Sequence, residues 1–152
     1  MIIDEEIISG GVTPFIITKL IERHERESQR YRLLHDYYMG DHRILSRRKR
    51  GKNVANNRIM CNHAKYITDM TQSYLVGNPV TYAVSDEYDI EAIKNEYLEQ
   101  DIPSLDSEIV KNMSIYGKAY ELIYADEKSK PRSVRLDPEH TFVCYSQSAF
   151  EK

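Results

Sequence analysis

Residues 115–136 read IYGKAYELIYADEKSKPRSVRL, and this stretch decides the fold class because its pattern changes from helical to extended within a few residues. Gly117 is a predicted helix stop, since a residue without a Cβ atom readily takes the left-handed conformation that ends many helices. Residues 119–125 are then predicted as a strand, residues 126–131 as a polar turn, and residues 133–136 as a second strand. The stretch therefore predicts a helix followed by an antiparallel hairpin.

The longest predicted helix lies far upstream of this hairpin, at residues 13–39. Thr13 is a suitable N-cap, Pro14 fits the first helical position, and Gly40 offers a C-terminal stop. A break near Ser28 is the alternative, because the inner face is mostly polar between residues 22 and 30. The predicted inner face carries Ile17, Leu20, His24, Tyr31, Leu34 and Tyr38.

Three shorter helices are predicted at residues 62–76, from residue 85 or 86 onward, and from Pro103 to Gly117. The first of them has an apolar stripe at helical spacing, formed by Tyr66, Ile67, Met70 and Tyr74. Short strands are predicted at residues 80–84 and 141–145. The fold class is therefore α+β, with a long N-terminal helix and further helices followed by a small antiparallel sheet.

Four residues are predicted to be structural corners of this fold: Gly40, Gly77, Pro79 and Gly117. Each of the three glycines closes a helix where a left-handed residue is convenient. Pro79 prevents the second helix from continuing and favours an extended chain after it.

A net charge of −3 hides a strong separation of charge along the chain. Residues 43–58 contain no acid and seven bases, namely Arg43, Arg47, Arg48, Lys49, Arg50, Lys52 and Arg58. Residues 86–108 are acidic, with Asp86, Glu87, Asp89, Glu91, Glu96, Glu99, Asp101, Asp106 and Glu108 against Lys94 alone. Such polarity indicates a partner of opposite charge, either a nucleic acid or the acidic segment of another copy of the chain. Two solvated surfaces without a partner are the competing interpretation.

The sequence lacks the usual arrangements of catalytic residues, and we predict neither an enzyme nor a cofactor. It contains no phosphate-binding glycine loop and no nucleophile elbow. His35, Asp36, Asp41 and His42 converge at a predicted helix end, where a metal-dependent hydrolase site is the third-ranked hypothesis. Histidine and aspartate are common as helix caps, so we favour no metal site there.

The two cysteines and the apolar segments indicate the compartment. Cys61 and Cys144 lack CxxC spacing, which fits a reduced cytosolic protein, and Cys144 is expected to be buried in a strand. No basic, apolar leader opens the chain, and no run approaches the roughly 18 apolar residues of a membrane span. We predict a protein made in the cytoplasm that does not enter a membrane.

Local signatures along residues 13–145 resemble a known family. They are, in order, residues 37–44 (YYMGDHRI), 56–59 (NNRI), 62–69 (NHAKYITD), 74–82 (YLVGNPVTY), 115–121 (IYGKAYE) and 136–139 (LDPE). Each is weak alone, but together and in this order they resemble the N-terminal part of portal proteins from long-tailed bacteriophages, the segment that belongs mostly to the wing region.

The resemblance implies a structural subunit of a ring, generally of twelve copies, at one vertex of the virion capsid. Such a ring conducts double-stranded DNA during packaging and ejection. It docks the terminase and the head–tail connector, and it contacts scaffold and major capsid proteins. Its subunits are made in the host cytoplasm.

The resemblance also implies a domain organisation: an N-terminal arm at residues 1–12, a wing-like α+β domain at residues 13–145 that includes a basic loop at 41–61, and a truncated end at 146–152. Stem, clip and crown regions are absent from the chain, so a fragment, a truncated prophage gene and an incomplete record stay open. The alternative function is a small nucleic-acid-binding protein that uses residues 43–58 for phosphate contacts.

Overall fold

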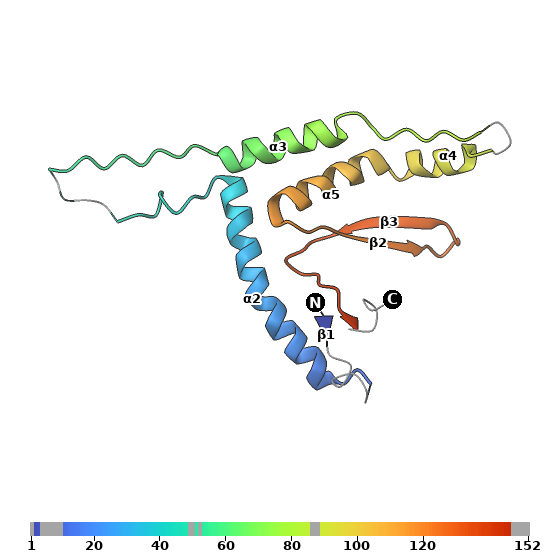
Figure 1. Cartoon of the computed structure of the whole chain (residues 1–152), viewed down its shortest axis with the longest axis horizontal. Coiled ribbons are helices and arrows are strands. Elements are labelled where there is room, and N and C mark those ends of the chain that lie inside the picture. The colour runs from blue at the N-terminus through green and yellow to red at the C-terminus, as the bar shows by residue number, and fades with distance from the viewer. Residues whose placement is uncertain (1, 4–10, 49–50, 52, 86–88, 147–152) are drawn as a thin grey trace.

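The computed structural model describes residues 2–3, 11–48, 51, 53–85 and 89–146 of the chain. Within these ranges the helices are α2 (Pro14–Met39), α3 (His63–Val76), α4 (Glu91–Glu99) and α5 (Ile102–Tyr116). The strands are β1 (Ile2–Ile3), β2 (Tyr120–Ala125), β3 (Pro131–Leu136) and β4 (Tyr145–Ser146). Helices come first and a small antiparallel sheet follows, so the predicted α+β class is confirmed (Figure 1).

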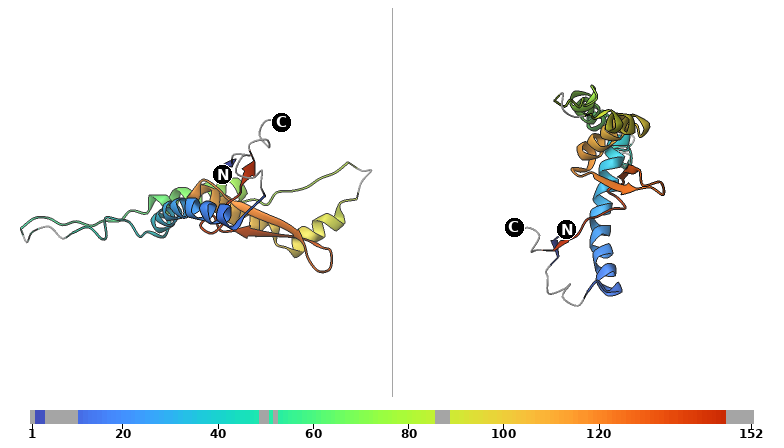
Figure 2. Two further views of the ribbon diagram at one scale, coloured as in Figure 1. Left: turned by 90° about the horizontal axis from the view of Figure 1, so that it is seen from below. Right: turned by 90° about the vertical axis from the view of Figure 1, so that its right-hand side faces the viewer.

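The long helix α2 begins and ends where the sequence predicts. The Thr13 side chain accepts a hydrogen bond from the Ile16 amide at 3.4 Å, and Gly40 ends the helix at φ 90°. The helix is continuous through Ser28, so the alternative of a break there is wrong. Ile17 was expected on the inner face but is exposed, because the N-terminal half of α2 extends away from the other helices (Figures 1 and 2).

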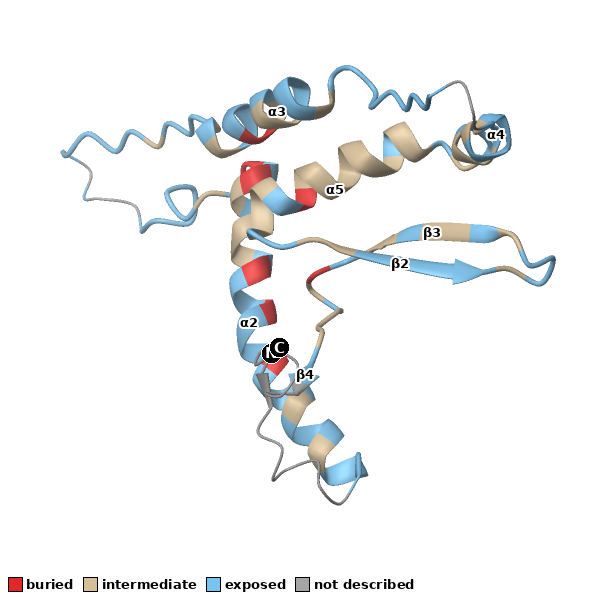
Figure 3. Cartoon of the chain, turned by 45° about the vertical axis from the view of Figure 1, so that its right-hand side comes forward, coloured by how far each residue is buried: buried red, intermediate tan, exposed pale blue. Residues whose placement is uncertain are grey.

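The buried residues lie along α2 from His24 to Gly40, where α2 meets α3 and α5, and at Pro138 after β3 (Figure 3). Most of them are polar or tyrosine rather than aliphatic. Tyr31 and Tyr38 are buried together with His24, Ser28, Thr68 and Asn112. Helix α2 is also tied to the segment after β3, since the His24 Nε2 atom lies 2.9 Å from the Glu139 carbonyl oxygen.

Helices α3 and α5 lie side by side, and polar groups join them (Figure 1). The Gln72 amide donates to the Ser107 hydroxyl at 2.6 Å, and the Ser114 and Thr68 hydroxyls are 3.3 Å apart. The apolar stripe of α3, which the sequence suggests is buried, faces outward instead. Its residues Tyr66, Ile67, Met70 and Tyr74 are between 54% and 89% exposed. Helix α5 likewise exposes an apolar residue, Met113, next to the buried Asn112.

Two predictions for residues 80–99 are wrong. Residues 80–84 form no strand, because they run along the surface without a ladder partner. The acidic helix, predicted from residue 85 or 86, begins only at Glu91, and no side-chain hydrogen bond caps it at Ile90. Asp86 and Glu87 lie outside the described residues.

The predicted hairpin is confirmed. Strands β2 and β3 are antiparallel, with Tyr120 paired to Leu136 and Ala125 paired to Pro131. The predicted strand at residues 141–145 is reduced to β4, which pairs in parallel with β1 rather than with the hairpin. Because most of that segment is irregular, Cys144 is exposed and not buried as expected. None of the described helices has the length and apolar character that crossing a membrane requires.

Candidate interaction surfaces

In its described parts, residues 41–48, 51 and 53–61, the basic loop projects from the junction of α2 and α3, away from the rest of the chain (Figures 1 and 2). Its base is anchored by Asn62, whose side-chain amide donates to the Tyr38 carbonyl at 2.9 Å while its oxygen caps α3 at Lys65. Gly40 packs closely there, since an added Cβ would lie 3.2 Å from the Met60 methyl group. These contacts hold the base of the loop against the C-terminal end of α2 and the start of α3.

The predicted contact residues of the loop fall into three groups. Arg43, Arg47 and Arg48 are exposed. Arg58 is half-buried, and its guanidinium donates to the Leu45 carbonyl at 3.0 Å, which ties the two sides of the loop together. Lys49, Arg50 and Lys52 lie outside the described residues. The exposed group is the one available to an anionic partner.

Of the four residues considered for a metal site, His42 has other side-chain contacts and Asp41 has a backbone contact that closes a helix. The His42 ring stacks on Tyr37 with centroids 4.8 Å apart, and its Nε2 atom lies 3.1 Å from the Tyr37 carbonyl oxygen. The Asp41 amide donates to the Asp36 carbonyl at 2.8 Å and so closes the end of α2. Within the described part of the chain, no three histidine, cysteine or acidic side chains come together in a way that holds a metal ion.

The predicted corners differ in their backbone conformation. Gly40 and Gly117 both take positive φ, at 90° and 72°. Gly77 does not, because its φ is −64°, so the expectation of a left-handed residue there is wrong. A different constraint applies to Gly77, since an added Cβ would lie 2.2 Å from the Ser73 carbonyl oxygen. Pro79 follows in an exposed, irregular segment.

The acidic helix α4 lies at the opposite end of the long axis from the basic loop (Figure 1). Much of its charge is neutralised by the hairpin. Lys130 binds Glu96 at 3.4 Å and Glu99 at 3.0 Å, and Arg132 binds Glu96 at 3.8 Å. Glu91 pairs with Lys94 on its own helix. These glutamates are therefore occupied within the chain, and for Glu96 and Glu99 the sequence did not indicate it because Lys130 is 34 and 31 residues away.

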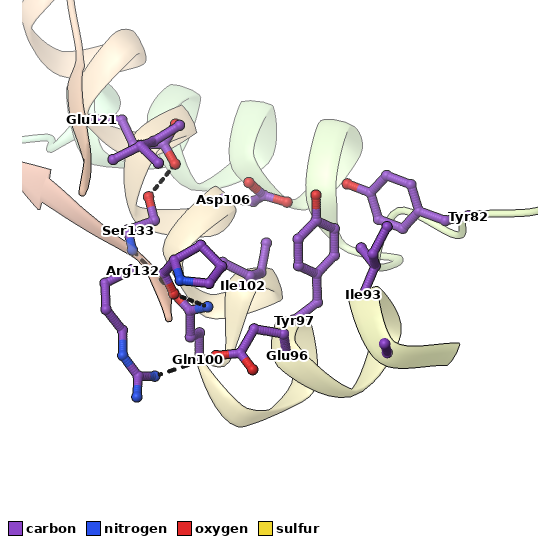
Figure 4. Close-up of a pocket in the computed structure, with 13 residues that line it drawn as sticks. Tyr82, Ile93, Glu96, Tyr97, Gln100, Ile102, Asp106, Glu121, Arg132 and Ser133 are labelled. Carbon is purple, nitrogen blue, oxygen red and sulfur yellow. Dashed lines mark hydrogen bonds and ion pairs between the residues drawn. The ribbon is translucent and has the colours of Figure 1, made fainter. Parts of the chain in front are cut away.

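A pocket of about 640 Å³ opens between α4, α5 and the hairpin (Figure 4). We call it the tyrosine–carboxylate pocket. The Tyr82 and Tyr97 rings meet edge to face within it, with centroids 5.1 Å apart. Its lining includes Tyr82, Ile93, Tyr97, Ile102, Asp106 and Glu121. Sequence reasoning missed this pocket, because its residues come from four separate segments and form no motif.

The electrostatics of the pocket favour a positive ligand group. Burial, with the nearby negative charge of Glu121, raises the pKa of the Asp106 carboxyl. Glu121 itself accepts a hydrogen bond from the Ser133 hydroxyl. Arg132 also lines the pocket, but its guanidinium is held by Asp126 at 3.0 Å as well as by Glu96.

Comparison with known proteins adds two findings. The family model described as "Phage portal protein, SPP1 Gp6-like" matches residues 17–152 of the chain. The chain is also similar to the portal protein of Bacillus phage SPP1, with 30% identity over 145 residues that cover 88% of this chain. It spans 28% of the length of that relative.

Proposed function

The chain belongs to the phage portal protein family, SPP1 Gp6-like, and from this premise we propose that it is a structural subunit, or part of one, of a portal ring at a capsid vertex. The observation that carries the proposal is the family match across residues 17–152, which includes most of α2 and all of α3, α4, α5 and the hairpin. We further propose the wing-like role for residues 13–145, with residues 1–12 as an N-terminal arm.

The shape of the chain supports a ring role. A closed ring of identical subunits repeats a head-to-tail contact, so each subunit needs two different surfaces that complement each other. The exposed arginines of the basic loop and the tyrosine–carboxylate pocket lie toward opposite ends of the long axis (Figure 1). Such an arrangement is compatible with a repeated head-to-tail contact.

By the same family argument we propose that the assembled ring conducts double-stranded DNA and docks a terminase and a head–tail connector. Scaffold and major capsid proteins are its proposed neighbours in the virion, and no cofactor or catalytic step is part of the proposal. The basic loop contacts either a neighbouring subunit or DNA in this proposal, because Arg43, Arg47 and Arg48 are exposed to solvent.

A chimeric protein tests the ring role. This chain replaces the matched part of the Bacillus phage SPP1 portal protein, and native mass spectrometry with negative-stain electron microscopy reports the assembly. We expect closed rings of uniform mass, like those of the unaltered control. A chimera that is folded by circular dichroism and yet monomeric contradicts the proposal. Sedimentation of the 152-residue chain at rising concentration is the second measurement, and species larger than a dimer are expected there.

A second candidate function is nucleic-acid binding through the basic loop alone. The exposed arginines favour it, since phosphate contacts require accessible cations. It predicts binding of duplex DNA that weakens steeply with added salt and does not depend on the base sequence.

A further inference from the structure

The tyrosine–carboxylate pocket contains a carboxylate that the chain leaves without a partner. Among the described residues, no hydrogen bond or ion pair reaches the Asp106 carboxylate, although it is half-buried between Tyr97 and Glu121. A half-buried charge without a counter-ion is costly, because the surrounding protein solvates it less well than water does. The pocket is therefore better suited to hold a cation than to remain empty.

The aromatic residues of the pocket point to the same ligand class. The faces of tyrosine rings attract ammonium and guanidinium groups within about 6 Å of the ring centroid. Tyr82 and Tyr97 hold their rings at a fixed interplanar angle of 70° beside Asp106 (Figure 4). A ring pair next to a carboxylate offers a cation both a face to lie on and an oxygen to bind.

Three of the chain's own bases at this end are already engaged. Lys130 binds Glu96 and Glu99, Arg132 binds Glu96 and Asp126, and Lys94 binds Glu91. The exposed arginines of the basic loop lie at the far end of the long axis from α4, so they do not fold back onto the pocket of the same chain (Figures 1 and 2). A cation from the basic loop reaches this pocket only from another molecule.

We propose that the tyrosine–carboxylate pocket receives an arginine side chain from the basic loop of a second copy of this chain. The inference rests on the proposed ring role and names the two surfaces of the repeated contact. The pocket volume of about 640 Å³ falls in the range of about 300–1,000 Å³ that binding sites for small molecules occupy. Arg43, Arg47 and Arg48 are the described candidates for insertion, because all three are exposed.

Charge decides between a second copy and DNA as the partner at this pocket. Asp106 and Glu121 repel phosphate groups, so the pocket itself is unsuited to a DNA contact. The basic loop is attracted to both kinds of anion. If the basic loop binds a second copy of the chain, its binding depends on Asp106. If the loop binds DNA, its binding does not depend on Asp106, because DNA offers no such pocket.

The test uses the 152-residue chain and a synthetic peptide with the sequence of residues 41–61. Nuclear magnetic resonance follows the signals of Tyr82, Tyr97 and Asp106 while the peptide is added. We expect saturable shifts at these residues, and Asp106→Asn is expected to weaken binding about tenfold, as for the loss of one charge-assisted hydrogen bond. Glu127→Gln is the matched control, because it removes the same charge from the exposed hairpin turn outside the pocket and should leave binding unchanged.

A second measurement guards against a variant that fails to fold. In a background with Cys61→Ser and Cys144→Ser, one preparation carries Ser46→Cys in the basic loop and the other carries Ala92→Cys in the pocket lining, so the arginines and tyrosines of the contact are kept. Mixing them under mild oxidation should give a disulfide-linked mixed dimer in clear excess over the control pair of Ser46→Cys with Glu127→Cys. The two preparations differ in which cysteine they carry, so the mixed dimer reports contact between copies.

The outcomes separate this inference from the proposed function. Peptide binding that Asp106→Asn does not change, or shifts confined to residues outside the pocket, overturns the inference. Rings that form equally well in the chimera with and without Asp106→Asn overturn it too, while the ring role stands. A folded chimera that makes no ring contradicts the ring role itself, whatever the peptide does. Loop peptide that binds duplex DNA but not the chain assigns the loop to nucleic acid.

Discussion

The carbonyl oxygen of Ser73 occupies the space in which residue 77 would carry a Cβ atom, only 2.2 Å from that position. Glycine is therefore required at position 77 by a close backbone approach and not by its φ of −64°. We expect Gly77→Ala to lower the free energy of unfolding by about 1 kcal/mol or more, because overpacking against a backbone atom forces α3 to shift. Urea denaturation followed by circular dichroism measures the change.

Gly51→Ala is the control for this prediction, since nothing lies within 4 Å of an added Cβ there and its φ is not in the left-handed region. It should leave the urea midpoint unchanged. Equal midpoints for Gly77→Ala and the wild type would show that the end of α3 accommodates a methyl group without cost.

Gly117 is constrained by its backbone conformation and not by lack of space. Its φ is 72°, and an added Cβ would meet no atom within 4 Å. We expect Gly117→Val to cost about 1–2 kcal/mol, because left-handed backbone is strained for a β-branched residue, and Gly117→Asn to cost clearly less. Thermal melts of the two variants provide the comparison. A valine variant as stable as the asparagine variant contradicts the left-handed assignment.

The contrast between these two glycines shows what the sequence reveals and what it does not. Helix ends follow from local chemistry, so Thr13, Gly40 and Gly117 could be placed from the sequence, as could the alternating hairpin. Burial depends on which elements meet. The stripe of α3 has the spacing of a buried face, yet α3 meets α5 through Thr68 and Gln72.

Of the two candidate surfaces, only one could be predicted from the sequence. The basic loop is visible in the sequence because its charges are adjacent in the chain. The tyrosine–carboxylate pocket is not visible, because Tyr82, Asp106 and Glu121 become neighbours only when the hairpin folds under α4 and α5 (Figure 4). The neutralisation of Glu96 by Lys130 also depends on that packing.

The carboxylate of Glu27 gives the chain a pH dependence that can be measured. Hydrogen bonds from Lys118 and Tyr31 lower its pKa below the ordinary 4.5. The ionised form is thus favoured by folding, so its contribution is present above pH 4.5 and is lost as the pH falls through the lowered pKa. Because the side chain is about half exposed, the contribution is at most about 1 kcal/mol.

Glu27→Gln should therefore lower the melting temperature at pH 7, and the difference from the wild type should shrink toward pH 3. Glu25→Gln is the control, since Glu25 is an exposed residue of the same helix. If the difference stays constant with pH, the ion pair with Lys118 does not stabilise the fold.

Asp106 is expected to give a pH dependence of stability opposite to that of Glu27. Burial and the charge of Glu121 raise its pKa above the ordinary 3.8, so ionisation of this group opposes folding at neutral pH. Asp106→Asn should raise the melting temperature at pH 7, and the gain should vanish as the pH falls below 3.8, where both states are protonated. A lower melting temperature at pH 7 shows that Asp106 supports the fold instead.

Charge reversal in the basic loop distinguishes the possible roles of that loop. Arg47→Glu with Arg48→Glu places two acids on an exposed segment, where little effect on folding is expected because neither side chain is buried. If the loop binds the pocket of a neighbouring copy, the double variant should weaken self-association, and added salt should weaken self-association of the wild type, because exposed ion pairs are screened.

Rescue of the double variant must come from the pocket and not from α4. Glu91→Lys, Glu96→Lys and Glu99→Lys would break the ion pairs with Lys94, Lys130 and Arg132, so these changes should destabilise the chain without restoring association. Asp106→Lys should restore part of it, because the new cation faces the introduced glutamates. Sedimentation velocity at low and high salt measures both effects.

If the double variant associates normally but loses salt-sensitive binding of duplex DNA, the loop contacts DNA. If neither property changes, the loop is a solvated segment without a charged partner.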